Sequence, residues 1–262
     1  NKGYHACTNC LDDTESIYLD RSRKNVYLGH RRFLPTNHQC RKKGKHFKGE
    51  ADHRKKPAMR TGDHVLAMVN DLHVIFGKGP GGLAVPNDAE GHAPMWKKKS
   101  IFWDLPYWKD LEVRSSIDVM HVTKNLCVNL LGFLGVYGKT KDTPEAREDL
   151  QHLHEKDGMP PKQYEGPASY ALTKEEKEIF FECLLSMKVP TGFSSNIKGI
   201  INMPEKKFQN LKSHDCHVIM TQLLPVALRG LLPENVRLAI VKLCAFLNAI
   251  SQKVIDPEII PR

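Results

Sequence analysis

The sequence predicts a mainly helical protein with a small β element at its N-terminus. Beyond residue 60, apolar residues recur at spacings of three and four, the period of helices that bury one face. Before residue 40, two short apolar-rich segments flank a basic turn, as in a two-stranded hairpin. The chain has 262 residues, of which 40% are apolar, so it can bury a hydrophobic core.

Shifts in composition divide the chain into four regions. These are a β element of zinc-knuckle type at 1–40, a basic arm or linker at 41–60, a helical region at 61–205 and a helical hairpin at 206–262. The chain starts at Asn1 and stops at Arg262 without a terminal signature, so we expect a part of a longer protein. Its longest apolar stretch is interrupted by Pro225 and Arg229, which argues against a membrane-spanning helix.

A Cys-x-x-Cys pair, Cys7 and Cys10, directly precedes the expected hairpin, whose strands are residues 16–19 and 25–28. Two thiolates on a tight turn can occupy two corners of a tetrahedral zinc site. His30 and His38 could supply further ligands, although their separation exceeds the usual finger spacing. The alternative is a pair of ordinary thiols. Seven cysteines, an odd number with one close pair, are typical of a reducing compartment such as the cytosol or nucleus.

Positive charge is concentrated in the first quarter of the chain. Residues 1–60 hold 15 Lys and Arg against 6 Asp and Glu, whereas residues 61–262 hold 24 of each. An exposed basic segment of this kind neutralises phosphates and releases counterions from DNA. The alternative is a solvated charged linker. The residues predicted to contact DNA are Arg31, Arg32, Arg41, Lys42, Lys43, Arg54, Lys55 and Lys56.

The helical part has clear start signals. Thr61 or Asp63 can cap one helix, Pro144 suits a first helical position, and Thr173 with Glu176 has the pattern of a capping box. The expected helices span residues 61–72, 116–134, 144–156, 173–187, 213–231 and 233–254. We expect the second of these to be largely buried and the last two to pair antiparallel. Loops are expected at 77–82 and 192–204.

An aromatic cluster occupies residues 96–108 and contains all three tryptophans. Aromatic side chains can stack on extruded bases. Because Leu105 and Pro106 are interspersed and an apolar helix follows, we instead expect this cluster to pack in the core.

Two helix starts carry residues that could bind a metal. Asp118 and His121 lie three residues apart, on one helix face, and are the only residues here with a catalytic pattern. His214 and His217 have the same spacing. The alternative for both pairs is helix capping and first-turn electrostatics.

Longer strings resemble the transposases of plant CACTA (En/Spm-like) DNA transposons over nearly the whole chain. Besides the Cys7 and Cys10 pair, they are GHRRFLPTNH at 29–38, KKKSIFWDLPYWKDLEVRSSIDVMHVTKN at 97–125 and NLKSHDCHVIMTQLLPVALRGLLPENVR at 210–237. The last string resembles the start of the conserved domain that follows the transposase core in these plant proteins.

The resemblance implies an RNase H-like core in which two Asp and one Glu bind a pair of Mg²⁺ or Mn²⁺ ions. It places those carboxylates upstream and downstream of this chain, so the chain would be an insertion and flanking part of an incomplete core. It also implies that two His from the missing C-terminal region complete a zinc site with Cys7 and Cys10.

The predicted function is therefore part of a nuclear cut-and-paste DNA transposase that contributes DNA binding and zinc-supported structure. Its partners would be the transposon ends, with self-association or a companion transposon-encoded protein in addition and no membrane. The alternative is a degenerate or domesticated fragment that acts only as a DNA-binding or protein-interaction module.

Overall fold

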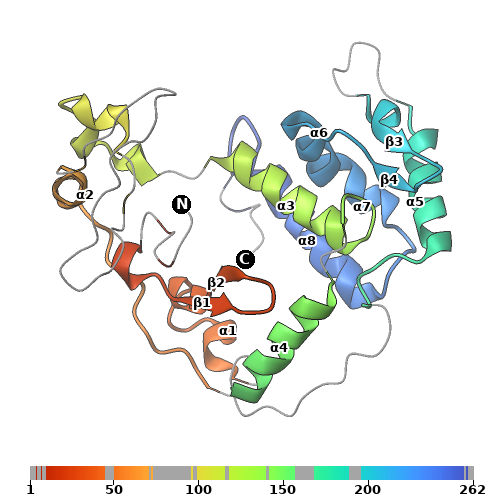
Figure 1. Cartoon of the computed structure of the whole chain (residues 1–262). Coiled ribbons are helices and arrows are strands. Elements are labelled where there is room, and N and C mark those ends of the chain that lie inside the picture. Colours follow the sequence, from red (N-terminus) through yellow and green to blue (C-terminus); the bar gives the residue numbers. More distant parts are fainter. Residues whose placement is uncertain are drawn as a thin grey trace, which may run out of the picture. The chain divides into compact units, whose positions relative to one another are not determined.

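The computed structural model confirms a mainly helical protein (Figure 1). It describes residues 10–44, 50–70, 99–115, 118–139, 142–156, 168–188 and 196–256, together with Tyr4, Cys7, Leu72, Trp96 and Glu258. Two compact units result: unit 1 comprises residues 1–116 and 152–160, and unit 2 comprises residues 117–151 and 161–262. No helix among the described residues is long and apolar enough to cross a membrane.

Unit 1 begins with the predicted hairpin. Strands β1 (Ser16–Leu19) and β2 (Lys24–Tyr27) pair antiparallel, with Ser16 opposite Tyr27. The second strand starts one residue earlier than predicted, because Arg23 takes a positive φ of 50° in the turn. A 3₁₀ turn (His30–Phe33) and the short helix α1 (Gln39–Lys42) follow. These elements and the returning chain, residues 50–60, are called the N-terminal module below.

Helix α2 (Gly62–Val69) supports the aromatic segment of unit 1. The Thr61 hydroxyl accepts a hydrogen bond from the His64 N–H (3.3 Å), which confirms Thr61 as the cap. A 3₁₀ turn (Trp108–Asp110) packs on α2 so closely that a Cβ atom on Gly62 would lie 1.7 Å from the Lys109 carbonyl oxygen. Glycine at this position is therefore a packing requirement. The loop predicted at 77–82 lies outside the described residues.

The aromatic segment does not form a core, contrary to the sequence prediction. Phe102 and Trp108 stack with ring centroids 4.8 Å apart. Phe102 is nevertheless 51% exposed, and Tyr107 is 56% exposed. Successive 3₁₀ turns, Ile101–Asp104 and Trp108–Asp110, are too short to present one continuous buried face.

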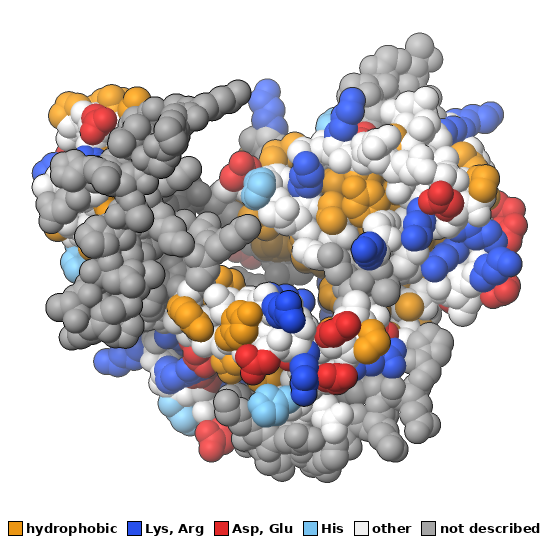
Figure 2. Space-filling model, viewed as in Figure 1, with side chains coloured by type: hydrophobic (Ala, Val, Ile, Leu, Met, Phe, Trp, Pro, Cys, Tyr) orange, Lys and Arg blue, Asp and Glu red, His pale blue; other side chains and the backbone are white. Residues whose placement is uncertain are grey.

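Unit 2 begins with α3 (Val119–Phe133), which the sequence predicted to be largely buried. Only one side is buried, formed by Thr123, Cys127 and Leu131. Val122 and Phe133 are 44% and 40% exposed, and Figure 2 shows apolar side chains at the surface of unit 2. The helix is apolar on two sides, and the rest of unit 2 covers one of them.

The next elements were predicted in part. Helix α4 (Pro144–Lys156) starts at its proline, and α5 (Lys174–Ser186) has the full capping box between Thr173 and Glu176. Part of the predicted loop at 192–204 is wrong. There, a 3₁₀ turn (Ile197–Ile200) leads into β3 (Ile201–Asn202), which pairs with β4 (Lys207–Phe208).

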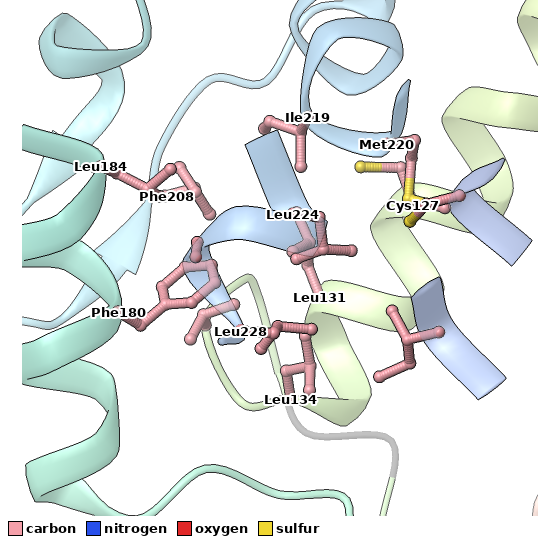
Figure 3. Close-up of a cluster of buried hydrophobic side chains, with 14 of the residues drawn as sticks. Cys127, Leu131, Leu134, Phe180, Leu184, Phe208, Ile219, Met220, Leu224 and Leu228 are labelled. Atoms are coloured by element: carbon pink, nitrogen blue, oxygen red, sulfur yellow. The ribbon is translucent and has the colours of Figure 1, made fainter. Parts of the chain in front are cut away.

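The core of unit 2 is aliphatic at its centre and aromatic toward α5 (Figure 3). Phe180 and Phe181 on α5 meet Phe208 of β4 edge to face, with centroids 6.1 and 5.1 Å away. Leu131 and Leu224 are fully buried in the same cluster. Edge-to-face pairing of this kind adds to the free energy of burial.

The C-terminal helices pack together, but the first is not continuous. It divides into α6 (Ser213–Val218), a π-helical turn (Ile219–Leu223) and α7 (Leu224–Ala227). Helix α8 (Glu234–Ile250) packs against the π-helical turn and α7, with Pro233 at its N-cap. The interruption lies just before Pro225, whose ring nitrogen has no hydrogen to donate within a helix.

Candidate nucleic-acid interface

The predicted DNA-contacting residues separate into arginines that hold the N-terminal module together and lysines that face solvent. Arg41 shows the first role most clearly, because it is only 3% exposed. Its guanidinium donates to the main-chain carbonyls of Leu34 (2.9 Å), Asp52 (2.8 Å) and Arg54 (2.5 Å). The prediction that residues 41–60 form an exposed arm is therefore wrong at Arg41, which cross-links three chain segments.

Arg54 connects the returning chain to the hairpin. It donates to both carboxylate oxygens of Asp52, at 3.0 and 2.8 Å, and forms an ion pair with Glu15. The Asp52 side chain is 1% exposed. Its hydrogen bonds from Arg54 lower the pKa of Asp52, although burial opposes this effect. Asp52 is therefore a buried carboxylate that stays ionised because Arg54 is bound to it.

Arg31 and Arg32 also make contacts within the module. Arg31 donates to the main-chain carbonyls of Cys40 (3.2 Å) and Glu50 (3.3 Å), and Arg32 to that of Asp13 (2.5 Å). Hydrogen bonds to main-chain carbonyls leave the positive charge in place and hold the guanidinium against the module's own main chain. The main observed role of Arg31 and Arg32 is thus to hold chain segments of the module together.

The lysines behave differently. Lys42, Lys43, Lys55 and Lys56 are all exposed. Their side chains form no hydrogen bond or ion pair within the part of the chain that the structure describes. The main-chain N–H of Asp52 donates to the Arg41 carbonyl at 2.8 Å, so the segments that carry the two lysine pairs run side by side. We call these four residues the lysine surface.

Cys7 and Cys10 do form a tight turn. The Cys10 main-chain N–H donates to Cys7 Sγ (3.4 Å), and the Leu11 N–H donates to the Cys7 carbonyl (2.9 Å). Cys10 is 4% exposed. Burial, followed by the hydrogen bond and charge of Cys7, raises the pKa of Cys10 to about 11. The pair fits two corners of a tetrahedral zinc site.

The predicted local histidines do not join this pair. His38 Nδ1 accepts from the Cys40 main-chain N–H (3.1 Å) and caps α1, while His30 lies at the start of a 3₁₀ turn. Among the described residues, no three His, Cys, Asp or Glu side chains are grouped so that they could hold a metal ion. The structure therefore places no third metal-binding side chain beside the two cysteines among the residues it describes.

The Asp118 and His121 pair forms a helix cap. Asp118 Oδ1 accepts from the main-chain N–H of His121 (3.1 Å), and both side chains are exposed. This geometry satisfies an N–H group of the first turn of α3. The structure brings no further acidic or metal-binding side chain to the pair among the residues it describes.

The other histidine pair also lies at a helix start. The cap residue is Lys212, and its main-chain N–H donates to Asp215 Oδ2 (2.9 Å). His214 is exposed, whereas His217 is half-buried. The structure does not combine these imidazoles into a metal-binding group with other described residues.

A pocket of about 890 Å³ lies beside the Asp52 and Arg54 pair. Its polar lining includes Glu15, His30, Arg31, Glu50, Asp52, His53 and Arg54, and its apolar lining is Leu28 and Ala51. Sequence reasoning missed this pocket, because its lining comes from three separate parts of the chain: Glu15, residues 28–31 and residues 50–54. The available signal was a pair of acidic residues within a basic run, Glu50 and Asp52.

Comparison with known proteins finds a family match at the start of the chain. Residues 1–72 match the model of a family described as "Transposase family tnp2". A search of curated proteins and a search of solved structures found no significant match. The matched segment contains the Cys7 and Cys10 pair and the lysine surface. Over these residues the chain is similar to a transposase family, which supports a transposase-related role.

Proposed function

We propose that this chain is part of a CACTA-type cut-and-paste DNA transposase and that its lysine surface binds the DNA backbone. The observation that carries the proposal is that arginines and lysines of the module have different roles. Arginines fix the N-terminal module through carbonyls and carboxylates, whereas the ammonium groups of four exposed lysines have no intramolecular partner among the described residues. The family match covers this same segment.

The physical role of the lysine surface follows from its chemistry. An ammonium group on a flexible stem is a mobile point charge that suits phosphate oxygens without reading base sequence. If each of four lysines neutralises one phosphate, log K against log salt has a slope of about −3.6 on duplex DNA. Binding would be largely indifferent to sequence and would weaken strongly at high salt.

Zinc would have a structural role at Cys7 and Cys10. When bound, it would tie the start of the chain to the segment that supplies the other ligands, and so add to folding stability. Cys10 is already buried and the turn is already formed, so the two thiols are preorganised. The CACTA resemblance assigns the remaining two ligands to histidines beyond this chain.

Strand cleavage is assigned to the complete nuclear transposase, not to this chain alone. The resemblance places the three catalytic carboxylates, and with them the Mg²⁺ or Mn²⁺ ions, outside the chain. We therefore expect the 262-residue chain to bind DNA without nicking it. The transposon ends would be its DNA partner, and their recognition would need other parts of the protein.

The test is a salt titration of DNA binding by fluorescence anisotropy. The variant carries Lys→Gln at positions 42, 43, 55 and 56. Its matched control carries the same change at Lys188, Lys198, Lys242 and Lys253, four exposed lysines of unit 2. We expect the first variant to lose affinity and slope on every duplex and the control to retain both. Equal losses in the two variants would refute a specific lysine surface.

A further inference from the structure

The pocket of the N-terminal module has polar groups that the module's own structure does not use. His30 and His53 line it, and neither side chain forms a hydrogen bond or an ion pair with the residues that the structure describes. Glu50 lines it as well and is exposed. Neutral imidazoles each offer one donor and one acceptor, and a carboxylate offers acceptors. The pocket therefore presents both kinds of hydrogen-bonding group.

The charges of the pocket argue against a phosphate inside it. Its lining has three carboxylates, Glu15, Glu50 and Asp52, against two guanidiniums, Arg31 and Arg54. Arg54 is already bound to Glu15 and Asp52. An anion in the pocket would thus meet a net negative charge. Both guanidiniums of the lining already make contacts within the module. A neutral group with polar edges suits the pocket better.

The shape of the pocket is held in place by the same contacts that fix the module. Arg54 joins Asp52 to Glu15, and Gly29 provides the room for this because its φ is 73° and a Cβ atom there would lie 2.4 Å from a Glu15 carboxylate oxygen. Leu28 and Ala51 add apolar surface. A volume of about 890 Å³ lies in the range of pockets that bind small ligands.

We propose that this pocket receives one unpaired nucleobase from DNA whose phosphates lie on the lysine surface. The inference rests on the proposed DNA binding and adds a base-binding site to it. A nucleobase is neutral, has flat apolar faces and carries donors and acceptors along one edge. Lys55 and Lys56 directly follow the pocket residues His53 and Arg54 in the sequence. A backbone bound at those lysines can therefore deliver a base to the pocket.

The test uses two DNA duplexes of the same sequence, one fully paired and one with a single bulged 2-aminopurine. We expect the 262-residue chain to bind the bulged duplex about tenfold more tightly, as one base held in such a pocket would give. The 2-aminopurine emission should change on binding. His53→Ala and Glu50→Ala should abolish the preference and leave affinity for the paired duplex unchanged, because both side chains are exposed.

His64→Ala is the matched control, since His64 is an exposed histidine of unit 1 that does not line the pocket. The Lys→Gln variant at 42, 43, 55 and 56 should weaken binding to both duplexes and keep their ratio. Equal affinities for the two duplexes, or a preference that survives both pocket variants, would overturn the base-binding site and leave the proposed DNA binding standing. Failure to bind either duplex would refute both proposals.

Discussion

The side-chain amide of Asn248 on α8 donates to the main-chain carbonyl of Thr221 across 2.9 Å. In a continuous α-helix that carbonyl would accept from the main-chain N–H of residue 225, which is a proline. Asn248 thus replaces the hydrogen bond that Pro225 cannot make, and it does so from a different helix. The π-helical turn (Ile219–Leu223) and α8 are coupled by this contact.

Asn248→Ala should therefore lower the free energy of unfolding by about 1–3 kcal/mol, because it leaves the half-buried Thr221 carbonyl without its donor. Urea denaturation measures the change. In a Pro225→Ala background, where an N–H is available again, the same substitution should cost much less. An equal cost in both backgrounds would contradict the replacement of the proline's missing bond.

Replacing Arg41 should unfold or loosen the N-terminal module, whereas replacing a lysine should not. Arg41→Lys keeps the charge but loses the planar group that reaches three carbonyls. We expect a loss of about 3 kcal/mol, since buried carbonyls remain unpaired. Thermal denaturation followed by circular dichroism checks this, with Lys42→Gln as the control, which should be within about 0.5 kcal/mol of the parent chain.

Stability of the N-terminal module should decrease in acid because of Asp52. Its pKa is lowered from an ordinary value of 3.8 by hydrogen bonds from Arg54. A carboxyl group with a lowered folded pKa stabilises the folded state above its ordinary pKa, and this contribution is lost as the pH falls through the folded pKa. The difference in unfolding free energy between the parent chain and Asp52→Asn should therefore be constant near neutrality and shrink below about pH 4.

Urea titrations at a series of pH values measure that difference. Asp20→Asn, at an exposed position in the hairpin turn, is the control and should show no comparable pH dependence. A difference for Asp52→Asn that stays constant down to pH 2 would contradict the assignment.

Gly62→Ala should destabilise unit 1, although alanine normally favours a helix over glycine by about 1 kcal/mol. The added methyl group would lie 1.7 Å from the Lys109 carbonyl oxygen, a main-chain atom that can move only with its whole turn. We expect a net loss of about 2 kcal/mol. Gly199→Ala is the matched control, because its nearest neighbour would be 3.8 Å away.

Cys7 and Cys10 should bind Co²⁺ used as a spectroscopic substitute for zinc. The chain with both thiols should show sulfur-to-cobalt charge transfer, and Cys7→Ser with Cys10→Ser should abolish it. Cys40→Ser is the control, since Cys40 is exposed and outside the turn. Because the described residues bring no third ligand to these two thiols, binding should be weaker than at a complete structural site. If the spectrum of the double variant is unchanged, Co²⁺ binds at residues other than Cys7 and Cys10.

Local signals predicted much of the fold. The capping box of Thr173 and Glu176, the helix start at Pro144 and the hairpin all depend on neighbours in sequence. All three were found, the hairpin with its second strand shifted by one residue. The pairing of β3 with β4 was missed because two-residue strands carry no readable periodicity.

The errors share a physical cause. Arg41 looked like part of an exposed basic run, and its burial depends on carbonyls of Leu34, Asp52 and Arg54 that only the folded chain brings together. The aromatic cluster was expected in the core because Leu105 and Pro106 are interspersed and an apolar helix follows. The position of a side chain relative to distant segments cannot be read from charge or composition, and the pocket was missed for the same reason.

The division between arginines and lysines has a chemical consequence for control of this surface. Acetylation of an exposed lysine removes its positive charge without touching the guanidinium contacts that hold the module. The surface charge of the N-terminal module can thus be lowered covalently while its fold is kept. Modification of Arg41 would first require unfolding, because that side chain is buried. Within residues 41–60, lysines therefore carry the surface charge that acetylation can remove, and arginines carry the contacts that keep the module folded.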